Sequence, residues 1–343
     1  MTAHLRSAFH GSLAAACIAD ALGAPTEELS RAQISAAFNG YVTEFHDPLP
    51  AAPYAKGRSA AQITDDSSQM IMLTELLVRT GGKLTPQDMA GLLVEWSTNE
   101  NYYPHFAGPT TRAAIEQLAA GADPWEVGRS GTIMTQGASN GGAMRVAPVG
   151  LFHHGDLQAA VQVAFTTCVP SHNTTAGVAG AAAIAAAVAE ACTENATLTG
   201  VVRAAKSGAR EGAELGRTQG RDVPGAQIDR RIDRAVALAM TAESDEQAID
   251  LIEGEIGVGL PAAEAVPAAL GFFVAAAGDP IRTAELAANA GGDSDTIGCM
   301  AAAIAGAFSG IEAIDPEVVR TVEQANGLDL RALTESLLQA SAR

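Results

Sequence analysis

Apolar residues recur at intervals of three and four along most of the chain, which is the spacing of one face of an α-helix. Residues 63–79 show the pattern clearly, with apolar side chains at Met70, Leu73, Leu76 and Leu77 and a Thr-Gly-Gly stop directly afterwards. The same spacing predicts further helices over residues 176–192, 261–277, 283–290 and 296–308. Strand-like alternation is scarce, so the pattern predicts an all-α protein.

Proline marks the start of two further helices. Thr85 followed by Pro86 is typical of an N-cap with proline in the first turn, and Asp315 followed by Pro316 has the same form. Proline is tolerated there because the first amides of a helix have no partner inside it.

Two stretches resist a helical interpretation. Residues 39–63 and residues 129–148 are rich in Gly, Pro and Asn, and both are predicted to be long loops. Long ordered loops in a compact domain are often functional. The chain shows no internal repeat and no break in composition, so residues 1–343 are expected to form a single domain.

The composition refines the all-helical prediction. Hydrophobic residues make up 48% of the chain but aromatic residues only 4%. Ala, Val, Leu and Ile must therefore build most of the core. Alanine has the highest intrinsic helix propensity, and small side chains allow helices to approach each other closely. We expect tightly packed helices rather than an aromatic-rich β-sandwich.

The charge limits the classes of partner. The formal net charge is −18, and a field of that sign repels nucleic-acid backbones and anionic membrane surfaces. We therefore expect neither nucleic acid nor membrane as a partner. A small phosphate-bearing ligand remains compatible, because bound metal ions or helix N-termini can invert the local potential.

The cysteines and the N-terminus bear on location. Single cysteines with no Cys-x-x-Cys pair favour buried, reduced thiols over a zinc site or a disulfide framework, and they lie at Cys17, Cys168, Cys192 and Cys299. Secretion is the alternative to a cytoplasmic location, because the apolar run at residues 13–19 could belong to a short signal peptide. Asp20 interrupts that run and no clean cleavage site follows, so a cytoplasmic protein is expected.

Candidate chemistry is concentrated in two acidic clusters. Residues 64–66 read Thr-Asp-Asp and residues 292–296 read Gly-Asp-Ser-Asp-Thr, each just before a predicted helix. Helix capping is the simplest interpretation of either cluster, because Asp, Ser and Thr are favoured N-caps and acids complement the helix dipole. Capping uses one side-chain oxygen per helix, however, whereas each cluster offers two carboxylates and a Thr hydroxyl.

Both clusters provide hard oxygen ligands, which suit Mg²⁺ or Mn²⁺ better than zinc or copper. If the clusters converge in space, their four carboxylates repel strongly unless cations lie between them. Two divalent ions roughly 3.5–4 Å apart are a common solution.

These clusters resemble the paired metal motifs of the ADP-ribosylglycohydrolases, the family of the ADP-ribosylarginine, ADP-ribosylserine and dinitrogenase-reductase glycohydrolases. Further segments match in the family's order: residues 19–27 (its G-D-x-x-G-x-x-x-E segment, with Ala19 replacing the first glycine), 108–112 (G-P-T-T), 140–145 (N-G-x-A-M-R) and 171–172 (T-H). The matches extend from about residue 8 to residue 310. Each motif is weak alone, but together they are specific.

The resemblance implies an all-α, compact, single-domain orthogonal helix bundle with two Mg²⁺ (or Mn²⁺) ions in a cleft. It implies that the direct metal ligands are Thr64, Asp65, Asp66, Asp293, Asp295 and Thr296. Asp65 and Asp295 would also be catalytic, because ions held there would orient the ribose hydroxyls and a water beside the anomeric carbon. The transition state is oxocarbenium-like, so orientation and electrostatics supply much of the rate enhancement.

Glu27 matches the glutamate that approaches the metal centre in the family, and is the candidate acid/base carboxylate. Without the resemblance, a solvated residue beside Glu28 after a proline turn would be the simpler interpretation.

The segment at residues 140–145 is the candidate substrate loop. Gly141 and Gly142 leave backbone amides approachable by an anion, although a plain glycine-rich turn fits equally well. The resemblance implies that this loop holds the diphosphate or distal ribose, with Asn140 and Met144 among the contacts. Ala138 departs from members that carry a stacking aromatic nearby, which leaves adenine recognition open.

His172 is the remaining candidate for substrate binding, through a hydrogen bond or a proton. A helix cap or a satisfied polar contact is the alternative for a lone histidine at a helix start. His153 and His154 follow a predicted helix end and are interpreted as structural.

The leading hypothesis is metal-dependent hydrolysis of the ribose C1 glycosidic bond in ADP-ribosylated protein side chains or related ADP-ribosyl compounds. A second hypothesis keeps the chemistry but takes a smaller ribosyl metabolite or nucleoside. A third is a non-catalytic, crystallin-like binding protein, which the complete Thr-Asp-Asp and Asp-Ser-Asp-Thr sets disfavour.

Overall fold

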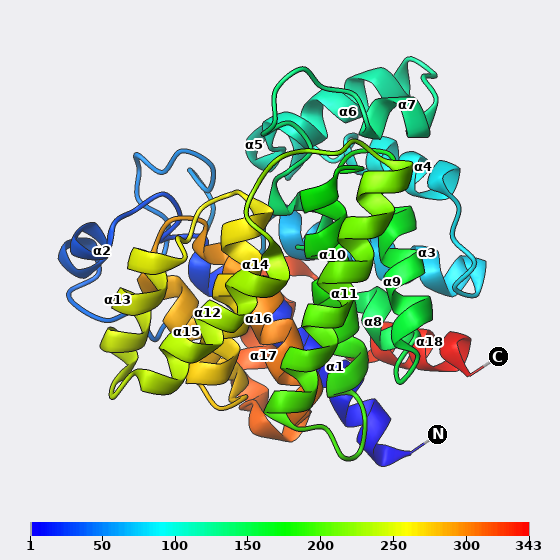
Figure 1. The fold of residues 1–343 in the computed structure, drawn as a ribbon. Coiled ribbons are helices and arrows are strands. Elements are labelled where there is room, and N and C mark those ends of the chain that lie inside the picture. The colour runs from blue at the N-terminus through cyan, green and yellow to red at the C-terminus, as the bar shows by residue number, and fades with distance from the viewer. Residues whose placement is uncertain (1, 343) are drawn as a thin grey trace.

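The computed structural model describes residues 2–342, and over that range it consists of helices without a β-strand (Figure 1). The first nine α-helices are α1 (Ala3–Gly23), α2 (Arg31–Ala37), α3 (Asp65–Thr80), α4 (Pro86–Trp96), α5 (Tyr103–Phe106), α6 (Pro109–Ala119), α7 (Pro124–Gly128), α8 (Ala147–Phe152) and α9 (Leu157–Cys168). The other nine are α10 (Thr175–Ala191), α11 (Leu198–Gln219), α12 (Ile228–Thr241), α13 (Asp245–Glu255), α14 (Ala262–Ala275), α15 (Pro280–Ala290), α16 (Ser294–Ser309), α17 (Pro316–Asn326) and α18 (Leu330–Ser341). The predicted all-α class is confirmed.

The core is built around two pairs of closely packed helices, α1 with α16 and α10 with α11. The middle of α10, residues 177–189, is buried all round and consists almost entirely of Ala, Gly, Val and Ile. Helices α14 and α15 cover α16, while α8 and α9 pack against α10. The core therefore has the small-residue character that the composition predicts.

The predicted helix ends hold at several positions. Helix α3 ends at Gly81 in the left-handed conformation (φ 60°), and α4 begins with a Thr85 cap and proline in its first turn. In α17 the Asp315 side chain caps the first turn by accepting from the Glu317 amide at 2.9 Å.

One loop prediction is confirmed and one is corrected. Residues 39–63 contain no helix and connect α2 to α3. Residues 129–148 do not form one continuous loop, because a short 3₁₀ helix, η1 (Asn140–Gly142), lies within them and α8 begins at Ala147. The glycines there permit a tight helical turn that spacing alone did not indicate.

The structure also bears on membrane spans and on the cysteines. Across the described chain, no helix combines the length and apolarity required to cross a bilayer. All four cysteines are buried and unpaired, as predicted.

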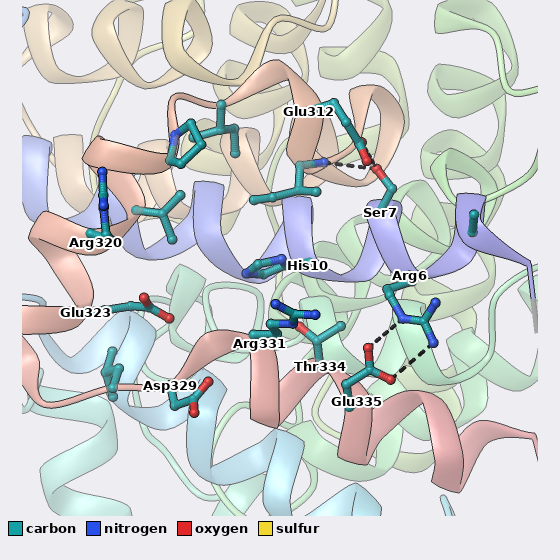
Figure 2. Close-up of a pocket in the computed structure, with 16 residues that line it drawn as sticks. Arg6, Ser7, His10, Glu312, Arg320, Glu323, Asp329, Arg331, Thr334 and Glu335 are labelled. Carbon is teal, nitrogen blue, oxygen red and sulfur yellow. Dashed lines mark hydrogen bonds and ion pairs between the residues drawn. The ribbon is translucent and has the colours of Figure 1, made fainter.

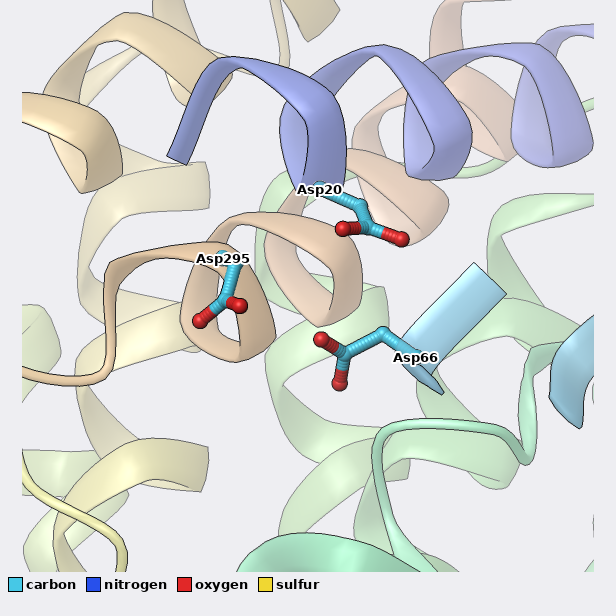
Figure 3. A group of neighbouring side chains, drawn as sticks. All are labelled: Asp20, Asp66 and Asp295. Atoms are coloured by element: carbon cyan, nitrogen blue, oxygen red, sulfur yellow. The ribbon is translucent and has the colours of Figure 1, made fainter. Parts of the chain in front are cut away.

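The fold brings three helix ends to one place. The C-terminal end of α1 meets the N-terminal ends of α3 and α16, and the side chains of Asp20, Asp66 and Asp295 point toward one another there (Figure 3). The two acidic clusters predicted to converge, 64–66 and 292–296, therefore do so.

Candidate metal centre

Three buried carboxylates from three helices form the first half of the centre. Asp20 on α1, Asp66 on α3 and Asp295 on α16 each offer one oxygen, and these oxygens lie within 4.8 Å of one another. Carboxylate oxygens at this separation can surround a single hard cation.

A second group of carboxylates shares a residue with the first. Glu27, Asp293 and Asp295 also place one oxygen each within 4.8 Å of one another. Asp295 therefore belongs to both groups. A carboxylate common to two clusters can serve a pair of neighbouring divalent ions.

The capping interpretation of the acidic clusters does not hold. Thr64 is the N-cap of α3 and Asp293 is the N-cap of α16, yet neither side chain makes a capping hydrogen bond. Asp20 serves α3 instead, because its carboxylate accepts from the backbone amides of Thr64 and Ser67 at 3.0 Å each. Capping by the Thr64 and Asp293 side chains therefore does not account for the two clusters.

Glu27 is held at the centre by its backbone neighbours. The Glu28 amide donates to the Gly292 carbonyl at 2.7 Å, and the Gly292 amide donates to the Leu29 carbonyl at 3.1 Å. Gly292 has φ 61°, and a Cβ there would lie 2.3 Å from the Val258 carbonyl oxygen. Only glycine fits this close approach, which connects the Glu27 turn to Asp293.

The buried carboxylates of the centre are more stable when protons or cations neutralise their charge. Burial raises the pKa of Asp293 to about 6, and burial followed by repulsion from neighbouring carboxylates raises the pKa of Glu27, Asp66 and Asp295 well above their ordinary values. Neutralisation by protons or by cations is the only way to keep so many acids buried together.

Two buried carboxylate oxygens show whether the centre suits cations. Asp66 Oδ1 and Glu27 Oε2 are shielded from solvent and have no hydrogen-bond partner among the described residues. An unpartnered buried carboxylate oxygen is costly unless a ligand satisfies it. Hard oxygen donors in this number suit Mg²⁺ or Mn²⁺. The residues present therefore fit divalent cations.

The remaining predicted ligands lie at the edge of the two groups. Asp65 is half-buried and belongs to neither group, although burial and then repulsion from Asp20 and Asp293 raise its pKa. The Thr64 hydroxyl donates to Asp20 at 2.7 Å and also lies 3.0 Å from Asp66. Thr296 is buried in the first turn of α16.

The predicted substrate loop contacts the centre directly. Asn140 Nδ2 donates to Asp293 Oδ2, and the Asn140 amide donates to the Leu260 carbonyl at 3.0 Å. Gly141 and Gly142 are buried beside Asn140 in η1, and Met144 is buried just beyond them. The loop therefore fixes one face of the Asp293 carboxylate.

His172 lies behind this loop. It is fully buried, and its ring nitrogens lie 3.0 Å from the Ser139 hydroxyl and 2.8 Å from the Ser171 hydroxyl. Burial and the charge of Arg145 lower its pKa to about 3, so the ring is neutral at physiological pH. A Cβ at Gly141 would lie 2.8 Å from its Nε2, which shows that the ring supports the loop from behind.

Two contributors escaped the sequence analysis. Asp20 lies in the matched N-terminal segment, but only Glu27 was singled out there; the shared motif was the available signal. Arg145 is fully buried and donates to Gln69 at 2.7 Å and to Ser171 at 3.0 Å. Its positive charge opposes, but does not reverse, the rise in the pKa of Asp65 that burial and the neighbouring carboxylates cause.

The comparisons with known proteins agree with this geometry. The family model for ADP-ribosylglycohydrolase matches residues 1–343. The chain belongs to the ADP-ribosylglycohydrolase family. The family expected from the motifs is therefore confirmed.

Individual relatives extend over much of the chain. The "Uncharacterized protein YegU" of Escherichia coli (strain K12) is 30% identical over 329 residues, which is 95% of each chain. An "Uncharacterized protein" of Archaeoglobus fulgidus is 32% identical over 176 residues, covering 51% of this chain and 53% of its own.

A solved structure shows the same fold. The chain superimposes on an "ADP-ribosylglycohydrolase-related protein complex" with a TM-score of 0.70 and 24% identity, over 99% of this chain and 100% of that one. The ADP-ribosylglycohydrolase fold therefore accounts for the whole helical arrangement.

Proposed function

We propose that this family member hydrolyses the C1 glycosidic bond of an ADP-ribosyl group, using two Mg²⁺ or Mn²⁺ ions. The observation that carries the proposal is the pair of carboxylate groups that share Asp295, with Glu27 in the second group. The ions would be held by Asp20, Asp66 and Asp295 on one side and by Asp293 and Asp295 on the other, with Thr64, Asp65 and Thr296 available at the edge. Bound there, the ions would orient and polarise the ribose 2′- and 3′-hydroxyls.

Glu27 is the residue assigned to proton transfer. Burial and repulsion from neighbouring carboxylates raise the pKa of Glu27, and its Oε2 has no hydrogen-bond partner among the described residues, so this oxygen is available to exchange a proton with a ligand. In the proposed reaction a water oxygen forms a bond to C1 as the bond from C1 to the side-chain atom breaks. Glu27 takes the proton from the water and passes it to the departing atom, so that the Glu27 carboxylate is regenerated.

The glycine loop and its support position the substrate. Asn140 orients Asp293, and the amides of Gly141 and Gly142 are assigned to the diphosphate or distal ribose, with Met144 beside them. His172 holds the loop through Ser139, as a neutral positioning residue.

The test is hydrolysis of ADP-ribosyl-arginine and ADP-ribosyl-serine peptides with and without Mg²⁺. Release of ADP-ribose that depends on the metal supports the proposal and identifies the linkage. Asp295→Asn is expected to abolish release, whereas the matched control Asp156→Asn, at the exposed N-cap of α9, is expected to retain it.

A smaller ribosyl substrate is the second candidate, favoured by Ala138 in place of an aromatic side chain beside the loop. A nucleoside panel in the same assay distinguishes the two. Metal-dependent cleavage of a nucleoside with none of either peptide would replace the first candidate by the second. Failure with every substrate would contradict the proposed hydrolysis.

A further inference from the structure

A cavity of about 760 Å³ lies between the first half of α1, the short helix η2 (Ile311–Ala313) and helices α17 and α18 (Figure 2). Sites for small molecules commonly measure roughly 300–1,000 Å³. None of the carboxylates of the candidate metal centre lines it. His10 in the cavity and Asp20 in the centre are separated by about 15 Å along α1, at 1.5 Å per residue. The cavity is therefore a separate place on the molecule.

Two of the four acids that line the cavity are bound by neighbouring side chains. Glu335 forms an ion pair with Arg6 at 2.5 Å, and Glu312 accepts a hydrogen bond from the Ser7 hydroxyl. These contacts are drawn at one end of the cavity in Figure 2. Both carboxylates therefore already have donors.

The other two acids are bound by backbone amides at the turn between α17 and α18. The Leu330 amide donates to Glu323 Oε1 at 2.8 Å, and the Ala332 amide donates to Asp329 Oδ1 at 2.8 Å. Asp329 is the N-cap of α18, so its carboxylate has a structural role. All four acids thus have partners within the protein.

Two polar groups of the cavity are unused. His10 Nε2, which donates or accepts according to the tautomer of the ring, is shielded from solvent and has no hydrogen-bond partner among residues 2–342. Arg331 makes no ion pair with any acid of the described chain, unlike Arg6 and also Arg320, which pairs with Glu317. Figure 2 shows the Arg331 guanidinium next to the His10 ring.

Charges of both signs surround His10 and Arg331. Burial is the main cause that lowers the pKa of His10, the charge of Arg331 lowers it further, and the charges of Glu323, Asp329 and Glu312 oppose this. A guanidinium beside an imidazole whose unpartnered nitrogen carries the proton can bind two oxygens of one anion. The four acids already have donors of their own, so they compete less with such an anion for Arg331 and His10.

The rest of the lining is apolar. Ile314 and Val319 are buried, and Ile311 and Leu328 are half-buried, in the wall formed by η2, α17 and the residues that follow each of them. An apolar wall that faces a cationic pair matches a ligand with a hydrophobic body and one anionic end.

We propose that this cavity binds a small organic anion, with its carboxylate or phosphate on Arg331 and His10 and its apolar body against η2 and α17. The site does not depend on the proposed hydrolase activity. The natural rival is a cationic ligand held by the four acids.

The test follows the His10 signal in the NMR spectrum of full-length protein labelled on its seven histidines, in the presence of Mg²⁺. His10→Gln identifies the signal. The probes share a phenyl ring and differ in the polar end: phenylacetate, phenyl phosphate, neutral 2-phenylethanol and cationic phenethylammonium. A saturable shift of the His10 signal with phenylacetate or phenyl phosphate is expected, and comparison of the two identifies the preferred anion.

Two arginine variants complete the test. Arg331→Leu is expected to weaken the anion at least about tenfold, the loss of one charge-assisted hydrogen-bonding pair. Arg203→Leu, an exposed arginine on α11 away from the cavity, is the matched control and is expected to bind like the unaltered protein. The proposal is overturned by equal affinity in the Arg331→Leu variant, by no saturable shift with either anion, or by tighter binding of phenethylammonium.

Discussion

At the scale of single residues, Asp20 shows what the site demands of the chain. Its carboxylate accepts the Thr64 and Ser67 amides and the Thr64 hydroxyl, and it also belongs to the first carboxylate group. One side chain therefore fixes the start of α3 and contributes to the centre. Because both roles depend on α1 meeting α3, a tertiary contact, helix periodicity could not reveal them.

Glu27 carries the most specific prediction at this scale. Replacement by Gln keeps the size of the side chain but removes its ability to take a proton at Oε2. We expect Glu27→Gln to lower kcat by roughly 10²–10⁴-fold, the usual contribution of general acid–base catalysis. Steady-state kinetics on the substrate identified above measures this.

The neighbouring Glu28→Gln variant is the matched control, because Glu28 is exposed and lies outside both carboxylate groups. It is expected to keep kcat within a few-fold of the unaltered protein. Equal kcat in Glu27→Gln and the unaltered protein would remove Glu27 from proton transfer.

At the scale of elements, the end of α17 holds the segment that leads into α3. Asn326 Nδ2 donates to the Ala61 carbonyl at 2.8 Å, and the Ile63 amide donates to Asn326 Oδ1 at 3.0 Å. Ala61 has φ 64°, a left-handed conformation that an alanine rarely adopts. The two hydrogen bonds help to keep this turn in place just before Thr64.

We therefore expect Asn326→Ala to destabilise the protein by about 1–3 kcal/mol, because two partly buried backbone groups lose their partner. It should also weaken Mg²⁺ binding, because the start of α3 is less well held. Urea denaturation and metal titration measure the two effects.

Asn195→Ala is the control, because Asn195 is exposed in the turn between α10 and α11. Unchanged stability and metal affinity in Asn326→Ala would show that the turn before α3 does not depend on this contact.

The same scale shows how far the sequence could be interpreted. Periodicity predicted the helices α3, α10, α14, α15 and α16 within a few residues, and caps predicted where α4 and α17 begin, because those signals are local. Convergence of the two acidic clusters was expected from their chemistry and their family motifs. The short helix η1 and the support of its loop by His172 were not predicted, because they depend on contacts between residues far apart in the chain. The organic-anion cavity likewise combines α1 with helices at the opposite end of the chain.

At the scale of the whole molecule, the buried acids connect stability to pH. The pKa of Asp293 is raised to about 6, and that of Glu27, Asp66 and Asp295 is well above the ordinary value. Acids in the unfolded chain titrate near pH 4. Without metal, the folded state therefore holds more protons than the unfolded state as pH rises above about 4.

The stability of the metal-free protein should accordingly be highest below about pH 4 as far as these acids are concerned, and should fall as pH rises through about 6 and beyond. Divalent cations replace the protons, so the fall should be much smaller with Mg²⁺. Urea denaturation with EDTA and with Mg²⁺ at several pH values measures this. A metal-free protein that becomes more stable between about pH 5 and 8, with no benefit from Mg²⁺, would contradict it.

The central claim, two ions that share Asp295, is tested most directly by the number of Mn²⁺ ions bound per chain in a calorimetric titration. We predict two for the unaltered protein, a loss of affinity for both in Asp295→Asn, and one remaining ion in Asp66→Asn, whose carboxylate belongs to one group alone. A single ion or none in the unaltered protein, or two ions bound with unchanged affinity in Asp295→Asn, would contradict the account.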